Sequence, residues 1–547
     1  MELLLGTAGA DPEVSVEPRR PARQWVPVAG AAVLAVGLTL RVTARYGVGA
    51  EPDTVTYLAA AHHLRAGHGF SDIGGEPLTL FPPLFPVAVL ALESLGLAPL
   101  SAARFLNAAL FGVLVVLAAV WTRRISGSST AGAVVAGIVA ISTPMVAMSS
   151  WALSEPVGIV TAVACLMLLT EVLRTAGAGR DGAGWPATGL AAAAGLAAAL
   201  SCLTRYASVV LFPVAAIVLA ARPGRRSGRV RLAAIFGVAG AAPFGAWLVR
   251  NVAVAGNVTG TRGGTSALSV AASMKGTLAA VGSWVIPGSS LPDLKAGVGT
   301  LLCLGVAVPL VVGAVVERRR GAPPAPGGGP ADGPAVGPAG LALPAAVFVV
   351  LGVLSVAGFE ATMAIDPPPR FLLPMFVPLL VGAAVLVALL SRRRSWRPPV
   401  TAGLVLVVAA ASLPRLGAYI ERADRRGLLD YSTPRWRTSP LLAYLRTHPV
   451  PGKVFSDDPY VLNLRLGVLA FQTPARTYWE SNKPTGELPL FVRRAAGAAA
   501  SGGLSVVWFP GSWQPWLYSL ADLERSVCLR EERHFADGDL LRTCPSN

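Results

Sequence analysis

Apolar stretches of about 20 residues alternate with short polar stretches along most of the chain. A helix of that length crosses a bilayer core of about 30 Å, so each stretch is a candidate membrane span. The pattern predicts about eleven spans, at residues 25–42, 102–121, 128–148, 156–173, 187–202, 206–220, 232–249, 296–316, 341–358, 371–390 and 398–413. We therefore expect a polytopic α-helical membrane protein whose transmembrane domain covers residues 25–413.

One further apolar stretch, FPPLFPVAVLALESLG at residues 81–96, is interrupted by three prolines and by Glu93. We interpret it as a helix that lies along the membrane surface. Counting it as a span would invert every later loop of the topology. The outer loop that contains it then extends from about residue 43 to residue 101.

The polar loops on the two sides of this topology differ in charge. Six of them hold 19 arginines, no lysines and seven acidic residues; they cover residues 1–24, 122–127, 174–185, 221–231, 317–340 and 391–397. Cytoplasmic loops carry an excess of basic residues, so this side is predicted to be the cytoplasm. The N-terminal tail 1–24 and the Pro/Gly-rich linker 321–340 are then cytoplasmic, and loop 43–101 lies outside. The tail lacks the basic start of a cleavable signal peptide, and we expect a multi-pass protein of the cell membrane.

The pattern changes at about residue 414, where the apolar runs become shorter and aromatic residues appear among charged ones. SPLLAYLRTHP and WLYSLADLER are typical of helices, whereas GKVFSD and LSVVWF are typical of strands. An odd number of spans places the C-terminus outside. We therefore expect residues 414–547 to form an extracytoplasmic α/β domain.

Two of the five cysteines, Cys528 and Cys544, bracket the segment LREERHFADGDLLRT of this domain. Its ADGD motif predicts a turn between two short strands, and such a hairpin brings the two cysteines together. Because the outer compartment is oxidising, we expect a disulfide between them. The other cysteines fall in predicted spans and are expected to be packing residues.

Composition agrees with a membrane protein and excludes one alternative. Only 14% of the residues are charged, against about 25% in soluble domains. The net charge of +16 could indicate a nucleic-acid partner, but the arginines of the cytoplasmic loops account for most of it. We therefore expect contact with membrane lipids and no nucleic-acid partner.

Candidate chemistry is concentrated in the outer loop, in EPDTVTYLAAAHHLRAGHGF at residues 51–70. Its candidate site residues are Glu51, Asp53, Tyr57, His62 and His63. Further charged residues lie at the outer ends of other predicted helices: Glu155, Arg205, Arg250 and Arg370. Charges at membrane depth are costly and normally have partners or water. Carboxylates with several arginines suggest a site that handles a proton and a phosphate, because a guanidinium donates two parallel bonds to phosphate oxygens.

Each of these residues also has a structural interpretation. An arginine at a helix end is often an interface anchor, and Asp53 or Glu155 could cap the helix that follows it. The histidines could belong to a solvated helix face. Helix capping by Asp53 would leave unexplained why the loop is long and rich in titratable groups.

The motifs PD-x-x-x-Y, GHGF, PPLFP, LSEP, LTRY, WLVRN and RFLLP follow one another in this order. The ordered set resembles the bacterial membrane glycosyltransferases of the GT-C class, in the group related to dolichyl-phosphate-mannose protein mannosyltransferases and aminoarabinose transferases. The resemblance covers about residues 25–415. It implies a sugar donor linked through phosphate to a polyprenol, and an extracytoplasmic glycan, lipid or protein as acceptor.

The resemblance also implies roles for individual residues. Asp53 matches the acid that activates the acceptor hydroxyl, and we take Glu155 as our own next candidate for this base. Arg250 and Arg370 match basic residues that hold the donor phosphate, and Arg205 is a third candidate for this role. A single displacement would invert the anomeric centre of the transferred sugar.

The chain departs from the family pattern in one respect. Many members carry adjacent Asp-Glu residues, whereas here Thr54 follows Asp53 and the second acid, Glu51, precedes it. Metal dependence varies within the family, so a divalent metal stays open and the histidines are not assigned as ligands. No other cofactor is implied.

The main alternative function is a transporter or lipid flippase of cell-envelope precursors. Such proteins bind their substrates near the bilayer midplane, often in inverted repeats. Here the predicted spans are nearly free of charge and no repeat is recognisable, which favours the transferase.

Overall fold

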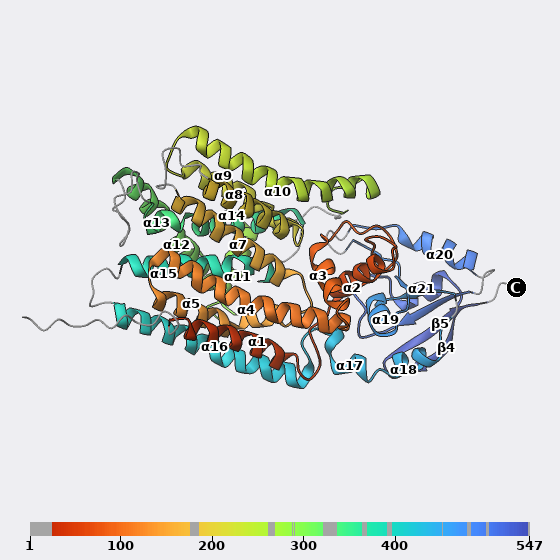
Figure 1. Cartoon of the computed structure of the whole chain (residues 1–547). Coiled ribbons are helices and arrows are strands. Elements are labelled where there is room, and N and C mark those ends of the chain that lie inside the picture. The colour runs from red at the N-terminus through yellow and green to blue at the C-terminus, as the bar shows by residue number, and fades with distance from the viewer. Residues whose placement is uncertain are drawn as a thin grey trace, which may run out of the picture.

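The computed structural model describes residues 24–175, 185–260, 268–286, 288, 290–320, 336–363, 369–390, 397–450, 452–478, 483–498 and 503–544. Long helices form a bundle, and a smaller region with a β-sheet lies against one end of it (Figure 1). The predicted tail 1–24, except its last residue, and residues 321–335 of the predicted linker lie outside the described residues.

Besides the short α13 (Pro338–Leu341), which packs against α12, the bundle contains thirteen α-helices among the described residues. They are α1 (Val26–Val42), α4 (Pro99–Ser126), α5 (Ser129–Ile141), α6 (Thr143–Ser149), α7 (Glu155–Arg174), α8 (Trp185–Cys202), α9 (Leu211–Ala221), α10 (Arg226–Ala255), α11 (Val270–Gly282), α12 (Pro292–Arg320), α14 (Leu343–Met363), α15 (Phe376–Leu390) and α16 (Arg397–Arg426). Small residues allow them to approach closely: a Cβ on Gly195 of α8 would lie 2.3 Å from the carbonyl oxygen of Phe236 in α10.

Every predicted span coincides with helical structure, which confirms the polytopic helical class. Within the described ranges, six helices are long and apolar enough to cross a membrane: Pro99–Ser126, Glu155–Arg174, Arg226–Ala255, Pro292–Arg319, Leu343–Ala361 and Arg370–Leu390. A seventh span results if α5 and α6, which are bent by 61° at their junction, are counted as one. Val26–Val42, Pro186–Cys202 and Tyr206–Ala221 are apolar but shorter. The total of eleven spans therefore stays a prediction.

Helix α11 lies in a stretch that the sequence pattern assigns to an outer loop. It packs against α12 and α14. The contact with α12 depends on glycine, because a Cβ on Gly299 would lie 1.9 Å from the carbonyl oxygen of Leu278. The helix is only 13 residues long and includes polar residues, so its hydropathy does not distinguish it from a loop.

The two ends of the bundle differ in character. At one end Arg124 pairs with Glu171 at 3.1 Å, and the buried Arg222 donates to the carbonyl of Val172 at 3.0 Å. At the other end lie α2 (Pro52–Arg65), α3 (Leu84–Glu93) and the C-terminal region (Figure 1). Helix α3, with 10 residues, is too short to span a bilayer, which agrees with its predicted position at the surface.

The C-terminal region contains a five-stranded sheet with the strand order β2-β1-β3-β5-β4, which confirms the predicted α/β fold. Its strands are β1 (Lys453–Ser456), β2 (Ala470–Gln472), β3 (Leu504–Trp508), β4 (Leu529–Phe535) and β5 (Gly538–Thr543). Strand β1 pairs in parallel with β2 and β3, whereas β5 pairs antiparallel with β3 and β4. The helices around it are α17 (Pro434–Arg437), α18 (Pro440–Thr447), α19 (Pro459–Leu466), α20 (Glu487–Ala498) and α21 (Leu520–Ser526).

Two boundaries differ from those that the pattern predicts. Helix α16 continues to Arg426, beyond residue 414, where the sequence predicts the start of the C-terminal domain. Helix α21 begins at Leu520 because Ser519 and Asp522 form a capping box, so the first residues of WLYSLADLER precede the helix.

The β4–β5 hairpin brings Cys528 and Cys544 together, as its turn motif suggests. Their sulfur atoms are bonded, and their Cα atoms are 5.5 Å apart. The amide of Cys544 also donates to the carbonyl of Cys528 at 3.0 Å. The disulfide therefore closes the open end of the hairpin.

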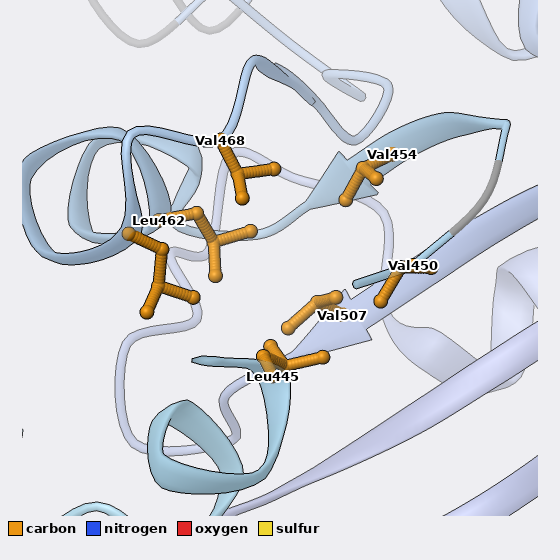
Figure 2. A pocket seen from close by; sticks show the side chains of 7 residues that line it. Leu445, Val450, Val454, Leu462, Val468 and Val507 are labelled. Atoms are coloured by element: carbon orange, nitrogen blue, oxygen red, sulfur yellow. The ribbon is translucent and has the colours of Figure 1, made fainter. Parts of the chain in front are cut away.

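A small cavity of about 20 Å³ lies between β1, β3, α18 and α19 (Figure 2). Seven aliphatic side chains line it: Leu445, Val450, Val454, Leu462, Leu466, Val468 and Val507. An apolar void of this size stays dry. It is a packing defect of the domain core and not a site for a polar ligand.

The C-terminal region is fixed to the outer loop by specific hydrogen bonds. The amide of Tyr431 donates to the carbonyl of Ala50 at 3.1 Å, and the Ser432 hydroxyl donates to the carbonyl of Val48 at 2.6 Å. Val55 of α2 belongs to the same buried apolar cluster as Tyr431 and Val461. The sheet is thereby held next to the start of α2.

Candidate active site

The start of α2 determines how its acidic residues are presented. Glu51 is the N-cap residue, Pro52 is the first helical residue, and the Thr54 hydroxyl accepts the amide of Glu51 at 3.2 Å. Asp53 therefore lies in the first turn and is not the N-cap. Capping does not explain an aspartate at this position.

Three carboxylates, two from the start of α2 and one from the start of α7, converge on one guanidinium. Arg370, in the short helix η4 (Pro369–Met375), pairs through Nη1 with Glu51 and through Nη2 with Asp53 Oδ2 at 3.0 Å. Its Nε lies 3.6 Å from Oε1 of Glu155, the first residue of α7. The same oxygen accepts from Arg205 Nη1 at 2.5 Å. We call these five residues the carboxylate–arginine cluster.

The cluster is largely shielded from water. The Glu155 side chain is 1% exposed and that of Arg370 is 17% exposed. Both guanidiniums lie near the ring of Phe371, with 5.0 Å from Arg205 and 5.7 Å from Arg370 to its centroid. Glu155 Oε2 is buried without a hydrogen-bond partner among the described residues. An ionised carboxylate in this environment depends on the two arginines for its stability.

Burial raises the pKa of Asp53, and the charge of Arg370 opposes this effect. Burial also raises the pKa of Glu51, and the charge of Arg370 again opposes this effect. With all groups ionised, three carboxylates face two arginines, so one negative charge is not compensated. The cluster is therefore suited to taking up a proton.

Tyr57 lies one turn after Asp53 and is 2% exposed. Its hydroxyl is 3.2 Å from that of Ser154, and its ring contacts Phe81 and Phe85 edge-on at 5.0 and 5.2 Å. Burial raises its pKa, so it stays neutral. Tyr57 joins α2 to the segment before α7 and thereby positions Asp53 next to Glu155.

Arg250 lies apart from the cluster. It donates through Nη1 to the carbonyl of Leu78 at 2.7 Å and through Nη2 to that of Phe70 at 2.9 Å. Its guanidinium lies 4.8 Å from the ring centroid of Trp247. In the described part of the chain, no ion pair or hydrogen bond connects it to Glu51, Asp53 or Glu155. Its contacts hold the segment that follows α2 against α10.

His62 and His63 lie in the last turn of α2, about 14 Å along the helix from Asp53. The two ring centroids are 6.0 Å apart, and the ring of His68 is 6.1 Å from that of His63. Their acidic neighbour Glu93 pairs with Arg65 at 3.4 Å. The histidines therefore form a separate group at the far end of the helix.

Within the described residues, one group of side chains could share a metal ion: Glu531, His534 and Asp539 on the β4–β5 hairpin. Glu531 and His534 are exposed, and His534 Nδ1 already contacts Asp539 Oδ1 at 2.5 Å. The carboxylates of the cluster converge on a guanidinium instead. They would suit a divalent metal only if Arg370 moved away.

A second, larger cavity of about 100 Å³ lies between α5, α6, α12, α15 and α16. The α5–α6 junction at Thr143 contributes to its wall, together with Trp284, Leu302 and Phe376. Arg415 is the only charged residue among the described residues that line it, and this arginine donates to the carbonyls of Trp284 and Val285 at 2.9 and 2.7 Å. The cavity is therefore mostly apolar and lies close to the segment that carries Arg370.

Sequence reasoning identified the members of the cluster but not all of the residues that support them. Phe371 follows Arg370 within the RFLLP motif, and Ser154 lies within the LSEP motif. Both residues could therefore have been identified from the sequence motifs. Tyr460 of α19 also lies near Asp53. The outer-loop motifs could not identify it, because it comes from the C-terminal region.

The family model for dolichyl-phosphate-mannose-protein mannosyltransferases matches residues 65–245. No curated protein matches the chain in sequence. The fold as a whole is similar to that of ArnT from Cupriavidus metallidurans bound to undecaprenyl phosphate, with a TM-score of 0.57 and 14% identity over 96% of this chain and 99% of that one.

Two structures of the Archaeoglobus fulgidus oligosaccharyltransferase are also similar, each with a TM-score of 0.51. The complex with Zn and sulfate is 13% identical over 88% of this chain and 68% of that one. The complex of AglB with an inhibitory peptide and a dolichol-phosphate is 12% identical over 91% and 72%. The predicted resemblance to GT-C membrane glycosyltransferases is confirmed at the level of the fold.

Proposed function

We propose that this protein is a membrane glycosyltransferase that moves a sugar from a polyprenyl-phosphate donor to an acceptor on the outer face of the membrane. The observation that carries the proposal is the carboxylate–arginine cluster, in which Arg370 contacts Asp53, Glu51 and Glu155 at one end of the bundle. The GT-C fold, and the lipid phosphates bound by the similar ArnT and AglB, support the choice of donor.

In the proposed reaction, the Asp53 carboxylate accepts the proton of the acceptor hydroxyl as that hydroxyl attacks the anomeric carbon. A positioned general base contributes about 10²–10⁴-fold to a rate. The bond between the anomeric carbon and the phosphate oxygen breaks, and the electron pair leaves with the polyprenyl phosphate. Attack from the side opposite the phosphate inverts the anomeric centre.

Arg370 and Arg205 are the proposed ligands of the donor phosphate. A phosphate that takes over the guanidinium of Arg370 removes the ion pair that lowers the pKa of Asp53. Asp53 becomes more basic as a result, so donor binding prepares the base. We assign Arg250 to holding the loop after α2, because backbone carbonyls occupy its Nη atoms.

The mostly apolar cavity, which is lined by Phe376 directly after η4, suits the first part of a polyprenyl chain whose phosphate reaches Arg370. A transporter or flippase would need charged groups near the middle of the bundle. The ion pairs of the described residues instead gather at its two ends.

The test is transfer by the purified full-length protein from labelled polyprenyl-phosphate sugars. Asp53→Asn should lower the rate by at least about 10²-fold without lowering the thermal unfolding temperature. Glu51→Gln is the matched control, because it also removes one carboxylate partner of Arg370, and it should have the smaller effect. Equal losses in both variants would assign the effect to the ion pair, and a near-normal Asp53→Asn would leave Glu155 as the candidate base.

We further propose that the cluster and the C-terminal region are extracytoplasmic and that the arginine-rich end is cytoplasmic. Glu76 in the outer loop and Ser227 in the first turn of α10 are both exposed. In intact cells, a membrane-impermeant thiol reagent should label Glu76→Cys at once, and Ser227→Cys only after permeabilisation. The opposite labelling pattern would invert the orientation.

A further inference from the structure

The carboxyl edge of the parallel strands in the C-terminal sheet has the features of a binding site. The connection that follows β1 leads to β2 on one side of it, whereas β3, on its other side, continues to β4 and β5 at the opposite edge of the sheet. Open α/β sheets bind ligands at such a point, outside the carboxyl ends of the strands. The segment that follows β1 is Asp457–Asp458–Pro459–Tyr460.

Asp457 connects the ends of the two central strands. It is 4% exposed, and its Oδ1 accepts the amide of Phe509, the residue after β3, at 2.8 Å. Its Oδ2 is buried and has no hydrogen-bond partner within the described residues. A buried acceptor without a partner is costly to a folded protein. It therefore needs a proton or a ligand group that donates to it.

Asp458 begins α19 and fixes its direction. Its side chain accepts from the Tyr431 hydroxyl at 2.7 Å and from the amide of Val461 at 3.4 Å. Tyr431 in turn donates through its amide to Ala50, directly before the N-cap of α2. The start of α19 is thus held at a fixed position relative to the start of α2.

Tyr460 lies in the first turn of α19, which packs against α2. Burial, together with the charges of Asp53, Asp458 and Asp72, raises its pKa to about 12. The ring is half-buried, and no hydrogen bond of its hydroxyl occurs among the described residues. An aromatic residue of the C-terminal region therefore lies within electrostatic range of the proposed base.

Aromatic rings and carboxylates together suit a carbohydrate. The ring offers an apolar face to the C–H groups of a sugar, and ionised carboxylates act only as hydrogen-bond acceptors, which hydroxyl groups satisfy. Three acidic residues lie within electrostatic range of Tyr460: Asp53, Asp72 and Asp458. Their charge disfavours an anionic acceptor and leaves a neutral sugar as the best match.

We propose that Tyr460 is an acceptor-positioning residue, and that the edge Asp457–Tyr460 forms with α2 a subsite for a neutral glycan whose hydroxyl reaches Asp53. The subsite rests on the proposed transferase function and specifies its acceptor class. It also assigns a task to the C-terminal region, which completes the site from a separate part of the chain.

The first experiment measures binding of methyl glycosides to the purified full-length protein by saturation-transfer difference NMR. Tyr460→Ala should reduce the glycoside signal by at least threefold. Tyr460→Phe keeps the ring and should retain most of the signal, which also controls for folding. Tyr478→Ala removes an exposed tyrosine of the same region and should leave the signal unchanged.

The second experiment measures transfer to a neutral alkyl glycoside. Tyr460→Ala should raise the KM for this acceptor about tenfold, with a smaller change in kcat and no change in the slow hydrolysis of the donor by water. An unchanged KM together with unchanged glycoside binding would overturn the subsite, and so would binding of a serine-containing peptide in place of the glycosides.

The two proposals can fail separately. Glycoside binding that depends on Tyr460, in a protein that neither transfers nor hydrolyses any polyprenyl-phosphate sugar, would overturn the transferase function and leave a sugar-binding surface. Transfer that depends on Asp53 but not on Tyr460 would keep the function and refute the subsite.

Discussion

Arg370 and Arg250 lie at the same end of the bundle, and the sequence suggests the same role for both. Their surroundings differ in one decisive respect. Arg370 contacts the carboxylates of Asp53 and Glu155, whereas Arg250 donates to the carbonyls of Leu78 and Phe70. The first set of partners is anionic and the second is neutral backbone.

This difference separates a substrate-binding arginine from a structural one. A phosphate can replace a carboxylate partner because both are anions that accept two parallel bonds from the guanidinium. A phosphate that replaced a backbone carbonyl would leave a polar group without a partner and release the loop that contains it. The role of each arginine is therefore indicated less by its position at the membrane boundary than by the type of group that accepts its hydrogen bonds.

The substitution Arg370→Lys is the strongest test of the difference between Arg370 and Arg250. Lysine keeps the positive charge but loses the planar fork that can contact several acceptors at once. We expect transfer to fall by about 10²–10³-fold, the range seen when one donor to a developing negative charge is lost. The measurement is kcat with a saturating donor, with the unfolding temperature as the control. Turnover equal to that of the parent would make Arg370 an interface anchor.

Arg250→Lys should have a smaller and different effect. The variant loses at least one of two charged hydrogen bonds to the loop, which costs about 1–3 kcal/mol of local stability. We expect faster proteolysis of the segment between Phe70 and Leu78 and a change in transfer of less than about tenfold. A loss of turnover as large as that of Arg370→Lys, with the loop still resistant to protease, would return Arg250 to the phosphate site.

The sequence predicted the helical class and the sheet region, because these depend on local patterns, and it placed the five residues of the cluster among its candidate site residues. Hydropathy identified the apolar helices, and the order of short motifs brought Asp53, Glu155 and Arg370 into one hypothesis. The pattern did not predict helix α11, whose packing depends on glycine contacts with α12. Such contacts join residues that are distant in sequence, and no local pattern records them.

For the same reason the sequence could not separate Arg250 from Arg370, or His62 from Asp53. Each assignment depends on which group lies opposite the side chain after folding. Tyr460 is the clearest case, because it approaches Asp53 only through the packing of α19 on α2. Chemistry-bearing residues were recognisable in the sequence, but their pairing was not.

The smallest expected effect is that of replacing the two histidines at the end of α2. The pH dependence of transfer distinguishes their role from that of Asp53 at the start of the helix. Burial raises the pKa of Asp53, and a base must be unprotonated to act, so transfer should fall as the pH is lowered through that raised pKa. A histidine that took part in the reaction could produce a similar acid limb. The double variant His62→Ala/His63→Ala removes this alternative at the far end of the helix, about 14 Å from Asp53. We expect its turnover to stay within about twofold of the parent and the midpoint of its acid limb to be unchanged. A shifted or missing acid limb in the double variant, at constant stability, would place the histidines in the reaction and remove the distinction between the two ends of α2.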